Sequence, residues 1–400
     1  MSLNPDSKKS KASERVRFIF SCAFAAFFCV GGIALVRDTA YNGHDFVAFW
    51  KAGHHLLTGE RIYSTARDGG MVFKYPPWIA PFFIPLALFP LALAKWIWGG
   101  IEVASLLAVM AWLRKKLPLH PFAIAFVTIS FWGIWAVHAL DGQIVLSLLA
   151  VALFCWSERE NFPNRFSLRL FFLVTALSTK IFTLFPLLGL RWSRRSWPAI
   201  FMIGAAFVAL SVPAAWNEPH HSAMSLIRSW KDCAGSAGRL LNAEQVRGDR
   251  NPGLPGYTLR LMGVPAWESN ADILVAILFS AIFGVAWWKL SKNSEAKVAW
   301  LGWLALAPVI HPLPWWHLFA FTFPLVVWVG SLSLKNKDPR LRALCFLGIL
   351  LICWSSQKVL GISGKFLELN AAKSWGTLLC LACLLSPMGK NTQTLRGISV

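Results

Sequence analysis

The feature that most constrains this chain is a series of long apolar runs, separated by short segments that carry most of its basic residues. A run of about 20 apolar residues is long enough to cross a bilayer as a helix. Apolar residues make up 56% of the 400 residues and charged residues 14%, against roughly 45–50% and 25% in soluble domains. We therefore expect an all-α, polytopic membrane protein with about ten to twelve spans, forming a single integral membrane domain over residues 1–400.

The distribution of lysine and arginine predicts the topology. Segments assigned to the cytoplasm hold 23 of the 39 basic residues in 71 positions, whereas segments assigned to the outside hold 14 in 109. This asymmetry follows the positive-inside rule and places both termini in the cytoplasm. The net charge of +20 is thereby explained without a nucleic-acid partner. The predicted spans lie at roughly 18–36, 76–112 (broken at Phe89-Pro90), 119–139, 143–157, 197–216, 270–288, 299–313, 316–333, 343–356 and 374–388.

Three segments depart from this simple pattern. Two predicted outer loops, 37–75 and 217–268, are large enough to build a site at one membrane face. The segment 169–190 is apolar but has basic residues at both ends, which predicts a re-entrant hairpin or two short spans with Lys180 near the apex. A lysine in an apolar segment costs ~3 kcal/mol at a helix centre and indicates function by default, although its side chain could also snorkel to the interface.

The first outer loop contains a predicted interfacial helix. Phe46, Phe49, Trp50, Gly53 and Leu57 fall at helical spacing and form one apolar face. Asp45 stands at the start of this helix. Its residue type suits an N-cap, and equally a carboxylate that deprotonates a hydroxyl at the membrane surface.

The same loop carries an ordered set of residues that resembles one family. Asp45-Phe46 is followed by Phe49-Trp50, Ala52-Gly53, Leu56-Leu57, Gly59 and Tyr63, then by Tyr75-Pro76-Pro77 and the run P-L-A-L-F-P-L over residues 85–91. This order resembles the bacterial polyprenol-phosphate-mannose-dependent mannosyltransferases of the glycosyltransferase C superfamily. That superfamily places an aspartate in its first outer loop as general base, and Asp45 matches it.

Weaker motifs extend the resemblance to about residues 40–330. They are Gly142-Gln143, Ala176-x-x-Thr179-Lys180 with Pro186, the loop Asn251 to Arg260 with Pro252 and Gly253 in place of Gln and Ser, and the segment His311 to His317 with His311 and Pro314 in place of serines.

The resemblance implies a reaction and its partners. The donor would be a polyprenyl-phosphate sugar, with mannose as the sugar, and the acceptor a glycolipid or growing glycan. The site would face the extracytoplasmic side of a bacterial inner membrane. Asp45 would act as general base with inversion, and the departing phosphate would need cations. The candidates for phosphate binding are Lys180, Arg260, Arg250 and Arg247, and those for the sugar or acceptor are His138, Asp141, Gln143, Asn251, Trp315, His317 and Tyr75.

Several residues also have structural readings. His138 and Asp141 could cap a helix, tryptophans at an interface are usually belt anchors, and Lys95 and Glu102 are expected to form a structural pair or a helix-packing contact. The adjacent pairs His54-His55 and His220-His221 are poor chelators, so no metal site and no cofactor is expected.

Three rival readings remain open at this stage. A lipid or solute transporter would carry charges buried in several spans and paired repeats of broken helices. A glycan polymerase or ligase using a polyprenyl-diphosphate glycan would depend on arginines of the second outer loop. A non-catalytic scaffold would tolerate loss of Asp45.

Overall fold

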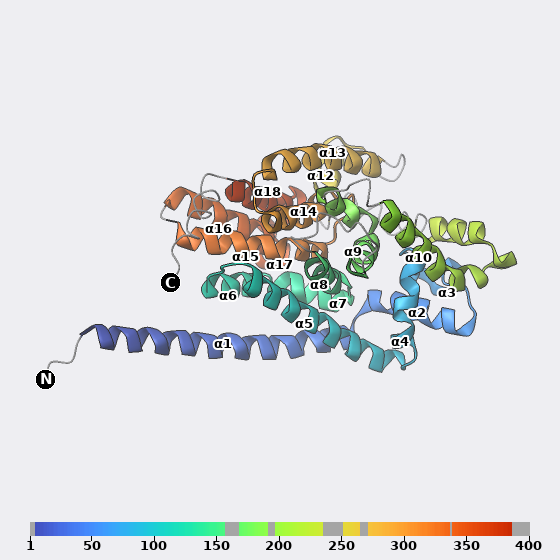
Figure 1. Ribbon diagram of the computed structural model, residues 1–400, viewed down its shortest axis with the longest axis horizontal. Helices are drawn as coiled ribbons and strands as arrows, with labels where there is room; N and C mark the ends of the chain where they lie inside the picture. Colours follow the sequence, from blue (N-terminus) through green and yellow to red (C-terminus); the bar gives the residue numbers. More distant parts are fainter. Residues whose placement is uncertain are drawn as a thin grey trace.

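A computed structural model of the chain describes residues 5–156, 168–190, 197–234, 251–264, 271–336 and 338–385. These residues form helices joined by short turns, and they contain no strand, which confirms the predicted all-α class. Figure 1 shows the helices gathered into one bundle, with α1 (Pro5–Tyr41) along one edge.

The first half of the chain surrounds the first outer loop. Its elements are α2 (His44–Thr58), α3 (Thr65–Asp68), η1 (Gly69–Met71), η2 (Pro77–Phe83), α4 (Ile84–Ala87), α5 (Leu91–Lys116), α6 (Pro121–Ser130), α7 (Trp132–Asp141), α8 (Val145–Cys155), α9 (Leu168–Ser178) and η3 (Ile181–Gly189).

The second half contains α10 (Trp197–Trp216), η5 (Pro219–His221), α12 (Leu254–Leu261), α13 (Ala271–Ser291), α14 (Ala296–Ile310), η6 (Trp316–Thr322), α15 (Phe323–Lys335), α16 (Pro339–Cys353), α17 (Gln357–Leu369) and α18 (Ala372–Leu385). The continuous segment from η6 to α15 is almost wholly buried and lies at the centre of the packing.

Five described helices are long and apolar enough to cross a membrane: Cys22–Tyr41, Leu91–Lys116, Trp197–Trp216, Ile273–Ser291 and Trp316–Lys335. Two bent pairs, α6 with α7 and α16 with α17, raise the number to seven if each pair is one span. Five further apolar helices are shorter. The protein is therefore a multi-pass membrane protein, while the predicted total of ten to twelve crossings stays a prediction.

Helix breaks fall where proline and polar residues interrupt the apolar runs. The run that begins at Pro76 breaks at Phe89-Pro90 into the short elements η2 and α4 and the long helix α5, as expected from proline's missing N–H. The segment 169–190 breaks at Thr179-Lys180 into α9 and η3, which contact each other. The break puts Lys180 between two short apolar elements.

The predicted helix in the first outer loop is α2. Phe46, Phe49 and Gly53 are buried as one face. Gly53 lies against the main chain of Phe83, where a Cβ would come within 2.7 Å of its carbonyl carbon. The apolar face of α2 therefore packs on protein, largely on η2, α4 and α5, whereas Leu57 at its far end is exposed.

Candidate functional site

Asp45 lies in the first turn of α2 and is not its N-cap. The N-cap is Gly43, which has a left-handed φ of 33° and makes no side-chain capping hydrogen bond. The Asp45 carboxylate is half-buried and accepts a hydrogen bond from Nε2 of Gln143. The N-cap reading of Asp45 is thus wrong, because the glycine one residue before the helix supplies the turn and the aspartate side chain is used elsewhere.

Gln143 reaches Asp45 because of the tight turn between α7 and α8. Gly142 adopts a φ of +67°, and a Cβ on it would lie 2.8 Å from the Cα of Gly43. Glycine is required there by both the conformation and the space. Trp98 of α5 donates from Nε1 to the carbonyl of Gly142 at 3.2 Å, which fixes the turn against the bundle.

Lys180 contacts the amide oxygen of Gln143, whose amide nitrogen binds Asp45. Its Nζ donates to Oε1 of Gln143 at 3.1 Å and lies 3.2 Å from Nε2 of His317. His317 is buried in η6, and its Nδ1 lies 3.5 Å from Oδ2 of Asp141 at the end of α7. Five predicted residues therefore form one connected group, which we call the Asp45 site: Asp45, Asp141, Gln143, Lys180 and His317.

The charges around Asp45 oppose one another. Burial and the nearby Asp141 carboxylate raise the pKa of Asp45, whereas Lys180, Lys74 and the Gln143 hydrogen bond lower it, with a net rise. Burial lowers the pKa of Lys74, and the Asp45 carboxylate opposes that shift. A carboxylate with a raised pKa is better matched to accepting a proton near neutral pH.

Lys74 is the charged neighbour of Asp45 that the sequence analysis missed. It directly precedes the Tyr75-Pro76-Pro77 motif, and its carbonyl accepts a hydrogen bond from Nε1 of Trp230 at 3.1 Å. The Tyr75-Pro76-Pro77 motif could have pointed to Lys74, because a residue directly before a motif lies in the same part of the loop.

Tyr75 lies beside the Asp45 site. Its ring stacks on Phe49, one helical turn after Asp45, with ring centroids 4.5 Å apart. Its carbonyl accepts a hydrogen bond from the hydroxyl of Tyr63 at 2.6 Å. Trp315 is half-buried at the N-cap of η6, two residues before His317.

Arg260 and Asn251 hold a loop together. Arg260 donates from Nη1 to the carbonyl of Asn251 at 3.0 Å and from Nη2 to the carbonyl of Leu369 at 2.8 Å. The buried Asn251 amide donates to the carbonyl of Pro312 at 2.9 Å. None of these contacts is with a residue of the Asp45 site. Arg247 and Arg250 lie outside the described residues.

His138 belongs to a buried polar cluster next to the Asp45 site. Its Nε2 lies 2.8 Å from Oε2 of Glu102, and the Ser147 hydroxyl donates to the other oxygen of that carboxylate. Glu102 therefore joins the two helices that flank the Gly142-Gln143 turn. The expected pairing of Lys95 with Glu102 is wrong, since Lys95 donates to the carbonyl of Asn42 at 2.9 Å. Both residues still make helix-packing contacts.

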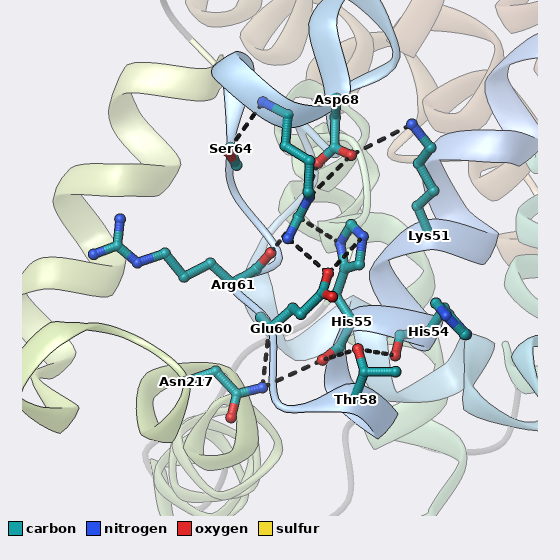
Figure 2. Close-up of polar contacts among 10 residues, drawn as sticks. Lys51, His54, His55, Thr58, Glu60, Arg61, Ser64, Asp68 and Asn217 are labelled. Atoms are coloured by element: carbon teal, nitrogen blue, oxygen red, sulfur yellow. Dashed lines mark hydrogen bonds and ion pairs between the residues drawn. The ribbon is translucent and has the colours of Figure 1, made fainter.

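A second polar cluster, the Arg67 network, stabilises the first outer loop (Figure 2). Arg67 donates to Glu60 at 2.8 Å, to the carbonyl of Arg61 at 2.6 Å and to Asp68 at 3.1 Å. Lys51 donates to the other oxygen of Asp68 at 3.3 Å. Burial, followed by the Arg67 guanidinium, lowers the pKa of His55, whose Nδ1 lies 2.8 Å from Arg67.

Metal coordination finds no support in this arrangement. Within the described ranges, no group of three or more His, Cys, Asp or Glu side chains could hold a metal ion.

The fold and site define a polytopic helical membrane protein in which a carboxylate and a lysine are joined by one amide side chain. The sequence model of glycosyltransferase family 87 matches residues 73–312. The chain belongs to this family and is a membrane glycosyltransferase. The match includes Gln143 and Lys180, while Asp45 lies before its first residue and His317 lies shortly after its last. No curated protein and no solved structure matches the chain.

Proposed function

We propose that this glycosyltransferase moves mannose from a polyprenyl-phosphate donor to a glycolipid or glycan acceptor at the extracytoplasmic face of a bacterial inner membrane. The observation that carries the proposal is the position of Gln143, which joins Asp45 to Lys180 through its two amide ends. A base for the acceptor and a cation for the donor phosphate then stand on either side of one fixed side chain.

Asp45 is the proposed general base. It takes the proton of an acceptor hydroxyl while the hydroxyl oxygen attacks the anomeric carbon of the sugar. The bond between that carbon and the phosphate oxygen breaks, and its electron pair stays on the phosphate. Attack from the face opposite the leaving group inverts the anomeric configuration. The raised pKa of Asp45 supports this role, because the base must hold the proton after transfer.

Lys180 is the proposed phosphate-binding cation. Transfer neutralises Asp45 and adds one negative charge to the phosphate, so negative charge moves from the base to the leaving group. A cation between them favours that movement, and Lys180 contacts Gln143 and His317 at this place. Arg260 is a weaker candidate, since two of its donors bind backbone carbonyls. Arg247 and Arg250 remain candidates from the sequence.

The sugar and acceptor are assigned to the residues around this pair. Asp141, His317 and Gln143 provide hydrogen-bonding groups, and Tyr75 and Trp315 provide aromatic faces. Asn251 and His138, also predicted for this purpose, have contacts that favour a supporting role. The loop 37–75 is accordingly the proposed catalytic loop, with 217–268 as the second outer loop and 169–190 as a re-entrant hairpin that presents Lys180.

The test is transfer of radiolabelled mannose from a synthetic polyprenyl-phosphate donor in membranes that contain the protein or Asp45→Asn at matched expression. Asparagine keeps the size of the side chain, and we expect transfer to fall at least ~100-fold, the scale of a general base. Asp38→Asn is the matched control, because it removes a carboxylate seven residues earlier in the chain.

Two outcomes would contradict the proposal. Equal transfer by the protein and Asp45→Asn would remove Asp45 as the base. Transfer from a polyprenyl-diphosphate glycan that survives Asp45→Asn but is lost with the arginines of the second outer loop would favour a polymerase or ligase.

A further inference from the structure

The helix α17 joins the apolar helices α16 and α18. The preceding helix α16 packs along α18, and α17 turns away from α16 by 105°. Gly361 has a φ of +58° and breaks α17 into two helical pieces, so Lys358 lies before the break and Ile362 to Leu369 lie after it. A Cβ on Gly364 would lie 2.0 Å from the carbonyl oxygen of Ser356, so glycine lets the second piece approach the turn that follows α16. The helix α17 also contacts α18.

The outward surface of α17 is apolar. Ile362 is 90% exposed and Phe366 is 65% exposed, and with Leu369 they fall at helical spacing on one face. The same helix buries Gly364 and Glu368 on its inner side. Leu344, Phe346 and Leu347 of α16 are exposed as well.

The residues around α17 match the headgroup level of a bilayer. Trp354 ends α16 and Trp375 lies in the first turn of α18, and both are exposed. Exposed tryptophans at helix ends are typical of the membrane–water interface. Lys358 and Lys365 on α17 are also exposed, and lysines near the membrane surface attract anionic lipid phosphates.

We propose that α17 lies in the bilayer surface, with Ile362, Phe366 and Leu369 in the boundary between headgroups and acyl chains and with Lys358 and Lys365 on anionic lipid phosphates. A helix of this kind binds by its buried apolar area together with attraction to anionic lipids. A second copy of the chain fits less well, because a two-fold contact between α17 helices would bring like-charged lysines together.

This surface is linked to the Asn251 loop. Arg260 binds the carbonyl of Leu369, at the end of α17, and the carbonyl of Asn251. Asn251 in turn binds the carbonyl of Pro312, five residues before His317. Arg260 therefore joins the end of α17 to the Asn251 loop, and Asn251 joins that loop to the segment before His317. The inference itself depends only on the membrane location of the chain and stands apart from the proposed donor.

Spin labelling of the full chain in single-protein nanodiscs tests the proposal. Cys22 and Cys29, the two exposed described cysteines, are replaced by alanine, and a label is placed at Ile362→Cys. Oxygen partitions into lipid and a nickel chelate stays in water, so their collision rates report depth. We expect the oxygen-to-chelate ratio to be several-fold higher at Ile362→Cys than at the matched control Ser363→Cys, which is exposed on the flank of the helix.

The lysines are tested in the same label background. Lys358→Gln with Lys365→Gln should lower the ratio at residue 362 in nanodiscs with anionic lipids and leave it unchanged in zwitterionic ones. Equal ratios at 362 and 363 would overturn the proposal. So would shielding of residue 362 from both reagents, which would indicate a protein partner. An oxygen-to-chelate ratio that stays unchanged when both lysines are replaced would contradict the proposed binding of the lysines to anionic lipid phosphates.

Discussion

The Asp45 site and the Arg67 network both use residues of α2 but are built differently. The Arg67 network joins neighbours, since Glu60, Arg61 and Asp68 are all within seven residues of Arg67. The Asp45 site joins segments far apart in the sequence, with 98 positions between Asp45 and Gln143 and 137 between Lys180 and His317. The first pairs its charges locally and stabilises a loop. The second joins a carboxylate and a lysine through the two ends of one amide.

The largest expected effect is a loss of transfer rate when the Asp45 site is changed but not when the Arg67 network is changed. Lys180→Met removes the cation of the Asp45 site while keeping a similar length, and we expect the transfer rate to fall about 100-fold to 1,000-fold, as when one preorganised donor to a developing charge is removed. Initial rates with synthetic donor in membranes measure it. Lys51→Met in the Arg67 network is the matched control. A normal transfer rate in the Lys180→Met variant would show that Lys180 takes no part in the reaction.

The next effect concerns the link between base and cation. Gln143→Ala removes the hydrogen bonds to Asp45 and Lys180. Hydrogen bonds to charged groups contribute about 1.5–3 kcal/mol, so we expect a loss of about 10-fold to 150-fold in the transfer rate. Gln143→Glu keeps the size but places a negative charge beside Asp45, and it should not restore the rate. Restoration by Gln143→Glu would contradict the bridging role.

A smaller effect is expected from the Arg67 network, and on stability. Arg67→Ala leaves the buried carboxylate of Asp68 with Lys51 as its remaining charged partner in the network. Loss of a partner by a buried polar group costs about 1–3 kcal/mol. Thermal unfolding of the detergent-solubilised protein should begin at a lower temperature, while transfer per folded molecule stays close to normal below that temperature. A large loss of transfer without a change in unfolding would place Arg67 in the reaction.

The smallest expected effect is a shift in the pH dependence of the transfer rate. Asp141 raises the pKa of Asp45 and Lys74 lowers it. A general base works when deprotonated, so the acidic limb of the rate profile follows the pKa of Asp45. Asp141→Asn should move that limb to lower pH, and Lys74→Gln should move it to higher pH. Rate profiles of both variants measure the shifts, and movement in the same direction would show that another group titrates.

These two clusters also show what the sequence could predict. Local patterns predicted two features that the structure contains, α2 from helical spacing and the break before α5 from proline. Motifs singled out Asp45, Gln143 and Lys180, which lie in contact, while their roles stay predictions. Contacts between distant segments could not be read from spacing, so the role of Glu102 beneath the turn and the position of Lys74 were missed. The assignment of Arg260 to phosphate rested on its residue type and its place in the Asn251 motif. Its hydrogen bonds to the carbonyls of Asn251 and Leu369 depend on contacts between distant segments.

The contact between Gly43 and Gly142 has a consequence for specificity. Because the two glycines meet as bare main chain, no side chain can change its rotamer to widen or narrow the space between α2 and the turn. The contact between Asp45, the proposed base, and the amide of Gln143 therefore stands on a main-chain contact that no rotamer can change. Adaptation to a sugar of another size must then take place in the longer side chains at the border, such as Tyr75 and Trp315, and substitutions there should change sugar preference while leaving the order of chemical steps intact.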